Sequence, residues 1–78
     1  MRQTEKPQTM LGHGELPFPK GTLVMDTFSE RTGELQGVIE ERLKGTGQLV
    51  SQMAFLRPRG GGIEWDTPLE HIEPVDNP

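Results

Sequence analysis

Between residues 21 and 75 the chain alternates short apolar runs with turn-forming residues. The runs cover residues 21–26, 34–41, 48–57 and 63–66, and a last one begins at Ile72. Side chains two positions apart share one face of a strand, so short alternating runs bounded by Gly, Pro, Asn, Asp or Ser are typical of β-strands. The pattern therefore predicts an all-β domain of five short strands.

Residues 34–43 also allow a helix, because their four large apolar side chains lie near helical spacing. The β-branched pair Val38 and Ile39 opposes this, as does the interior Gly37, because both lower helix propensity. An interior glycine in a strand often marks a bulge or a bend. We therefore favour a strand that bends at Gly37.

Three consecutive glycines at residues 60–62 predict a reversal of the chain between two strands, since glycine adopts positive φ without strain. The alternation that follows places Ile63 and Trp65 on one strand face and Glu64 and Asp66 on the other. After it, residues 67–70 predict one helical turn, with Thr67 as cap and proline at the first helical position.

The phase of residues 48–57 is ambiguous, because neither face of a strand there is cleanly polar. Alternation within the other runs indicates which side chains point inward. The predicted core consists of Leu23, Met25, Leu35, Val38, Phe55, Ile63, Trp65 and Ile72.

The first residues lack any strand or helix period. We expect a disordered tail at residues 1–16, a folded domain at residues 17–75 and a frayed end at residues 76–78. Phe18 lies between Pro17 and Pro19, a context that favours extended backbone and lets the ring lie on an edge of the domain.

Composition narrows the class of protein. The 78 residues contain no cysteine and no apolar run long enough for a signal peptide or a membrane span. We therefore expect a cytoplasmic protein, a monomer or weak homodimer that does not bind membranes. The formal charge of −4 opposes broad affinity for nucleic acid.

No catalytic, metal or cofactor motif stands out. The triple glycine leads into a strand, whereas phosphate-binding loops lead into a helix. Glu64 and Asp66, with Glu70, are better explained as a solvated strand face than as a cation site or an acid–base pair. His13 and His71 lack partners at metal-ligand spacing. We expect no enzyme and no cofactor.

Two kinds of binding surface are consistent with the sequence. The favoured one is a protein-binding surface on the domain edge, for which the candidate residues are Phe18, Arg57, Arg59, Glu64 and Asp66. The alternative is a nucleic-acid rim, formed if the turn at Lys44 lies near the glycine hairpin. Its candidate residues are Arg42, Lys44, Arg57 and Arg59.

The order of predicted elements resembles SH3-like small β-barrels. Residues 20–26 followed by 32–39 look like the opening of PRC-barrel and KOW-type domains. Residues 24–27, 56–58 and 60–66 are similar to a group of small uncharacterised actinobacterial proteins, many from Streptomyces, over about residues 20–75. The resemblance implies a five-stranded SH3-like barrel and a bacterial cytoplasmic setting, and transfers no functional residues. Together these expectations describe a small protein-binding adaptor or regulatory module.

Overall fold

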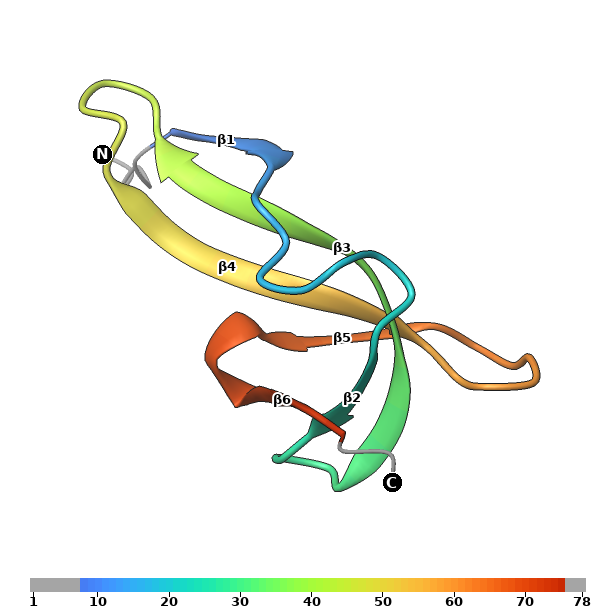
Figure 1. Ribbon diagram of the computed structural model, residues 1–78. Helices are drawn as coiled ribbons and strands as arrows, with labels where there is room; N and C mark the ends of the chain where they lie inside the picture. The colour runs from blue at the N-terminus through green and yellow to red at the C-terminus, as the bar shows by residue number, and fades with distance from the viewer. Residues whose placement is uncertain (1–7, 76–78) are drawn as a thin grey trace, which may run out of the picture.

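The computed structural model describes residues 8–75, which form one antiparallel sheet of six strands with a single 3₁₀ turn (Figure 1). The all-β prediction is confirmed. The elements are β1 (Thr9–His13), β2 (Leu23–Asp26), β3 (Arg31–Leu43), β4 (Leu49–Arg57), β5 (Trp65–Pro68), η1 (Leu69–His71) and β6 (Ile72–Pro74).

The strand order is β5-β4-β3-β2-β6, and β1 pairs with β3 outside this path. Within the described residues, β5 and β6 are the two ends of the path, so the sheet is not closed into a barrel. The expected closure is thus not what the structure shows, because η1 turns the chain from β5 to β6 without joining the two strands in a ladder.

Strand β3 is shared by two halves of the molecule. Its first residues pair with β2, and its last residues, from Ile39 to Leu43, pair with β1 along the same edge. Strand β4 follows the other edge of β3 for most of its length. The result is a curled half containing β2, β5 and β6, and an extended arm made of β1 and the far parts of β3 and β4 (Figure 1).

The strand prediction for residues 34–43 is confirmed, and so is the irregularity at Gly37. The register of β3 against β4 shifts between Leu35 and Gly37, which makes Gln36 the bulged residue. A second shift, where Arg42 faces Leu49, leaves Val50 as an extra residue in β4. Hydrogen bonds from strands on both edges hold β3 extended despite its helical spacing.

The disordered-tail prediction for residues 1–16 is wrong from Thr9 to His13, which form β1. This strand is held by backbone pairing with β3 and buries almost no side chain, so its sequence carries no amphipathic signal. The rest of that prediction, residues 1–7, and the frayed end at 76–78 lie outside the described residues.

The core lies on one face of the sheet. Its buried apolar residues are Val24, Leu35, Val38, Ala54, Leu56 and Ile72. Three partly buried residues, Phe18, Trp65 and Leu69, pack against five members of this core, Val24, Leu35, Ala54, Leu56 and Ile72. The sequence prediction was right for Leu35, Val38 and Ile72.

Five of the eight predicted core residues are not buried; Trp65 is half-buried and packs against the core, whereas the other four lie outside it. Leu23, Met25 and Phe55 lie one position out of phase with Val24 and Ala54, and a one-residue shift in a strand moves side chains to the other face. Ile63 is 86% exposed, because β5 begins only at Trp65 and Ile63 belongs to the preceding turn segment.

The predicted reversal at residues 60–62 is confirmed, with φ values of 86°, 108° and 127° at Gly60, Gly61 and Gly62. The helical turn predicted for residues 67–70 is present as η1 but two residues later, because Thr67 and Pro68 belong to β5 and Pro68 is the N-cap. Thr67 was wrong as the cap, because its hydroxyl donates to the buried Asp26 carboxylate at 3.0 Å.

Candidate functional site

The sheet has an inner face, which carries the core, and an outer face. Residues directly opposite each other in an antiparallel pair share a face, so the register assigns each side chain to one of them. Residues 14–20 approach the inner face: the Gly14 N–H donates to the Val38 carbonyl oxygen at 2.9 Å, and Phe18 packs on the core. On the outer face of the arm, the described side chains are half-buried or exposed.

The outer face is apolar where four strands lie side by side. His13, Ile39, Met53 and Pro68 face one another in a row across β1, β3, β4 and β5. Two further apolar side chains share this face on either side of the row. We call the five residues Leu11, Ile39, Met53, Phe55 and Pro68 the outer patch; Leu11 is 73% exposed and the other four are half-buried.

A hollow interrupts the outer patch at Gly37, which lies opposite Phe55. A Cβ atom placed on Gly37 would have no atom within 4 Å, because the missing side chain leaves open space above the strand. The resulting cavity has a volume of about 310 Å³ and is lined by His13, Gln36, Gly37, Ile39, Phe55 and Glu64. It is large enough to accept an apolar side chain from a partner.

Carboxylates surround the outer patch. Glu34 lies opposite Arg57, Glu41 lies opposite Leu11, and Asp66 lies opposite Phe55. Glu64 lines the Gly37 hollow and accepts from Arg57 Nη2 at 3.1 Å. Because Arg57 is paired with Glu64, its charge is balanced, and the other charged groups around the patch are acidic.

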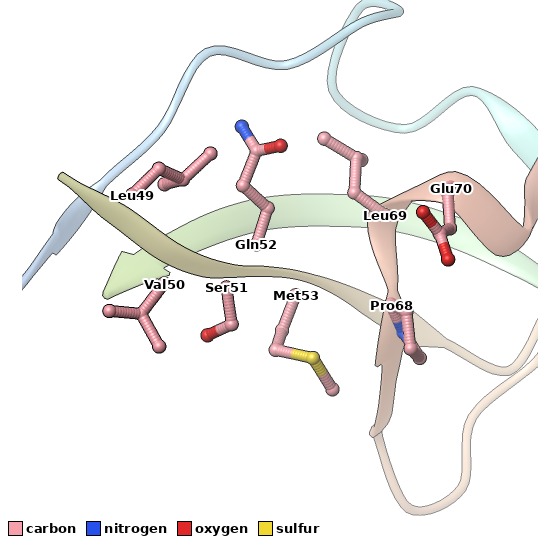
Figure 2. A pocket seen from close by; sticks show the side chains of 8 residues that line it. All are labelled: Leu49, Val50, Ser51, Gln52, Met53, Pro68, Leu69 and Glu70. Atoms are coloured by element: carbon pink, nitrogen blue, oxygen red, sulfur yellow. The ribbon is translucent and has the colours of Figure 1, made fainter. Parts of the chain in front are cut away.

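A second cavity, of about 440 Å³, lies where β5 separates from β4 (Figure 2). Strand β5 pairs only with β4 residues from Met53 to Leu56, so the beginning of β4 has no neighbour on that edge among the described residues. Figure 2 shows the side chains of Val50 and Ser51 on the same side as Met53, with Leu49 on the opposite side. This cavity therefore lies at the free edge of β4 and is lined by side chains from both faces of the sheet.

The structure divides the predicted protein-binding residues. Arg57, Glu64 and Asp66 lie together on the outer face, while Arg59 lies in the turn that follows β4. Phe18 lies against the core on the inner face and is half-buried. The five residues therefore do not form one surface.

The predicted nucleic-acid rim is not assembled either. Arg42 and Lys44 lie near the tip of the arm, whereas Arg57 and Arg59 lie at the other end of β4, roughly 25 Å away at the usual rise per residue (Figure 1). Arg42 also pairs with Glu40 at 3.1 Å. The turn at Lys44 and the glycine hairpin are kept apart because β3 and β4 are long strands.

Beyond the outer face, the most connected polar group is the Asp26 carboxylate, which is only 2% exposed. Its Oδ1 accepts from the Phe28 backbone N–H and from the Thr67 hydroxyl, both at 3.0 Å. Its Oδ2 accepts from the Ser29 hydroxyl at 2.9 Å and from Trp65 Nε1 at 3.1 Å. All four donors stabilise the ionised form.

These contacts decide the pKa of Asp26. Burial is the largest single effect and raises the pKa, but hydrogen bonds from Trp65, Ser29, the Phe28 N–H and Thr67 together outweigh it and leave the pKa below 3.8. The carboxylate is therefore ionised at neutral pH and joins the turn after β2 to β5. All four of its hydrogen bonds are made to other residues of this chain, so the role of Asp26 is structural.

The sequence prediction missed Leu11, Ile39, Met53 and Pro68 as surface residues. One available signal was the lack of a polar face in residues 48–57, which is unusual for an antiparallel strand with one solvated side. Leu11 gave no signal, because the segment around it looks like an unstructured tail until its partner β3 is known.

No protein-family model, curated protein or solved structure matches this chain. Among residues 8–75, no three His, Cys, Asp or Glu side chains gather in a way that could hold a metal ion. The same part of the chain contains no helix long and apolar enough to cross a bilayer.

Proposed function

We propose that this protein is a non-enzymatic protein-binding module whose docking surface is the outer face of the sheet. The observation that carries the proposal is the outer patch with the Gly37 hollow at its Phe55 end. An antiparallel sheet with only one covered face usually presents polar side chains on the other. An exposed apolar surface surrounded by polar groups is typical of an interaction site.

We also propose that the fold is related to SH3-like barrels, as a variant in which the sheet is left open between β5 and β6. Three features support it: the strand order, the long bent β3, and a 3₁₀ turn between the last two strands. The resemblance to small actinobacterial proteins and the bacterial cytoplasmic setting are parts of the same proposal.

The alternative function, binding of nucleic acid, has less support. A nucleic-acid surface needs cations gathered along one groove. Here Arg42 and Arg57 lie at opposite ends of β4, and each of them pairs with a glutamate. The charged groups around the apolar side chains of the outer face are mainly carboxylates, which would repel phosphate groups.

Substitution on the outer face tests the proposal. Leu11→Gln removes the most exposed apolar side chain of the outer patch without touching the core. Phe28→Gln is the matched control, because Phe28 is 81% exposed but lies in the turn between β2 and β3, far from the arm. Each form is immobilised and exposed to a native lysate, and the proteins retained are quantified.

We expect a stoichiometric partner that binds the unchanged protein and the Phe28→Gln form and is lost with Leu11→Gln. Equal retention by all three forms would contradict the outer face as the docking surface. Circular dichroism of the three forms checks that the sheet is intact.

A further inference from the structure

The charge around the outer patch indicates the charge of its partner. On the outer face, the described carboxylates beside the patch are Glu34, Glu41, Glu64 and Asp66, and the arginine among them, Arg57, is paired with Glu64. A second copy of this chain would bring the same carboxylates face to face, and the chain carries a net charge of −4. Like charges across an interface are costly, so charge complementarity favours a cationic partner over self-association.

The hydrogen bonding of the strands indicates the form of the partner. In the arm, β3 is paired on one edge with β1 and on the other with β4, so a partner cannot reach the patch by adding a strand to β3. The surface offered consists of side chains over strand interiors. An apolar sheet face of this kind is covered either by a second sheet or by a helix with an apolar stripe.

The dimensions fit a single helix. At the row of Ile39 and Met53, the four strands β1, β3, β4 and β5 lie side by side at about 4.8 Å spacing, which makes the face about 15 Å across at this row. A helix with its side chains is about 10–12 Å wide. The Gly37 hollow, of about 310 Å³, lies within this face and offers a place for one apolar side chain of the helix.

We infer that the outer patch binds a cationic amphipathic helix of another protein, whose apolar stripe lies on Ile39, Met53 and Phe55 and whose Lys or Arg side chains meet Glu41 and Asp66. This inference rests on the proposed function and adds the chemistry and the form of the partner. One apolar side chain of the helix occupies the hollow over Gly37.

Three synthetic peptides of about 18 residues test it, a length at which an amphipathic helix is just stable. The first has leucine at helical spacing on one face and lysine elsewhere. The second replaces every lysine by glutamate. The third keeps the composition of the first in an order without an apolar face. Binding is followed by backbone amide shifts in two-dimensional NMR at low and at moderate salt.

We expect the lysine peptide alone to shift the amides of Ile39, Met53 and Phe55, with affinity that falls several-fold as salt rises. Gly37→Val fills the hollow where a Cβ meets no neighbour, and should weaken binding at least about ten-fold while the sheet stays folded. Asp66→Asn should weaken it about two- to five-fold. Glu15→Gln, in the loop on the inner side, is the control and should leave it unchanged.

Equal binding of the lysine and glutamate peptides, or of the scrambled peptide, would overturn the cationic helix as the occupant. So would shifts confined to the inner face, or concentration-dependent shifts of the outer patch without peptide, which would indicate a second copy. If no peptide binds while Leu11→Gln still loses its lysate partner, this inference fails and the proposed function stands. If Leu11→Gln changes nothing in the lysate, the proposed function itself fails.

Discussion

At the scale of single residues, the Asp26 carboxylate accepts four of the described side-chain hydrogen bonds, more than any other group among residues 8–75. Each oxygen accepts one rigid N–H, from Phe28 or Trp65, and one hydroxyl, from Ser29 or Thr67. A hydroxyl can rotate to offer a lone pair instead of a proton, but an N–H cannot. This arrangement requires an acceptor at both oxygen positions.

Asp26→Asn should therefore destabilise the fold by about 3 kcal/mol, because either orientation of the amide directs its NH₂ group at one of the two rigid N–H donors. Thr67→Val is the matched control, because valine has a similar shape and lacks only the rotatable hydroxyl. It should lower the free energy of unfolding by only about 1 kcal/mol. Urea unfolding followed by Trp65 fluorescence measures both values. A loss no larger for Asp26→Asn than for Thr67→Val would show that the amide is accommodated.

The lowered pKa of Asp26 also makes stability depend on pH. Because the folded-state pKa lies below 3.8, the carboxylate contributes fully above the unfolded-state pKa, and the contribution is lost as pH falls through the folded-state pKa. The difference in unfolding free energy between the unchanged protein and Asp26→Asn should stay constant from pH 7 to about 5 and shrink below about pH 4. Urea titrations across this range measure it, and a difference that grows on acidification would contradict the ionised Asp26.

At the scale of elements, β3 contains two glycines with opposite surroundings. Gly33 is buried, and a Cβ there would lie 2.8 Å from the Arg57 carbonyl oxygen and 2.8 Å from the Trp65 ring. The Arg31 guanidinium lies over the same ring, 3.8 Å from its centroid. Gly37 faces open space in the outer hollow. The first glycine permits packing, and the second leaves a cavity.

We expect Gly33→Ala to cost about 2 kcal/mol, since backbone and ring must both shift to admit the methyl group. Gly37→Ala should be neutral or stabilise the fold by up to about 1 kcal/mol, because it restricts the unfolded chain and meets no neighbour. Thermal unfolding of the two variants provides the comparison. Equal destabilisation would mean that Gly37, like Gly33, is needed for close packing.

The sequence predicted the elements better than their faces. Gly37 and residues 60–62 identified the bend and the reversal, because an irregular backbone conformation requires glycine at particular positions. The phase of β2 was wrong because its buried face carries the Asp26 carboxylate, whereas its other face carries Leu23 and Met25. The phase of β4 was wrong because both faces of this strand are apolar, so the period of two does not distinguish core from surface. The same ambiguity hid the outer patch, whose residues were either assigned to the core or left unassigned.

At the scale of the whole molecule, burial is uneven. The apolar core cluster lies in the curled half, whereas β1 in the arm has no buried side chain. Sequence patterns could not predict β1, since it is specified by long-range backbone pairing. A strand held mainly by hydrogen bonds opens more easily than one held by packing.

Amide hydrogen exchange should separate the two halves. We expect the amides of Leu35, Ala54 and Leu56 to exchange only by global unfolding, and the paired amides of β1 to exchange with an opening free energy several kcal/mol lower. Exchange read by NMR at increasing denaturant measures both. Equal protection in β1 and in the core would show that the arm and the curled half unfold as one cooperative unit.

The pairing of β2 with β6 has a consequence for the order of events during synthesis. Asp26 faces Ile72 in the ladder, and its side-chain partners Trp65 and Thr67 lie almost as late in the chain. Contacts between such distant segments form slowly, because a long loop must close before they contribute. A nascent chain that ends before Ile72 therefore lacks the strand that borders β2, and the curled half can form only after the ribosome has passed β6.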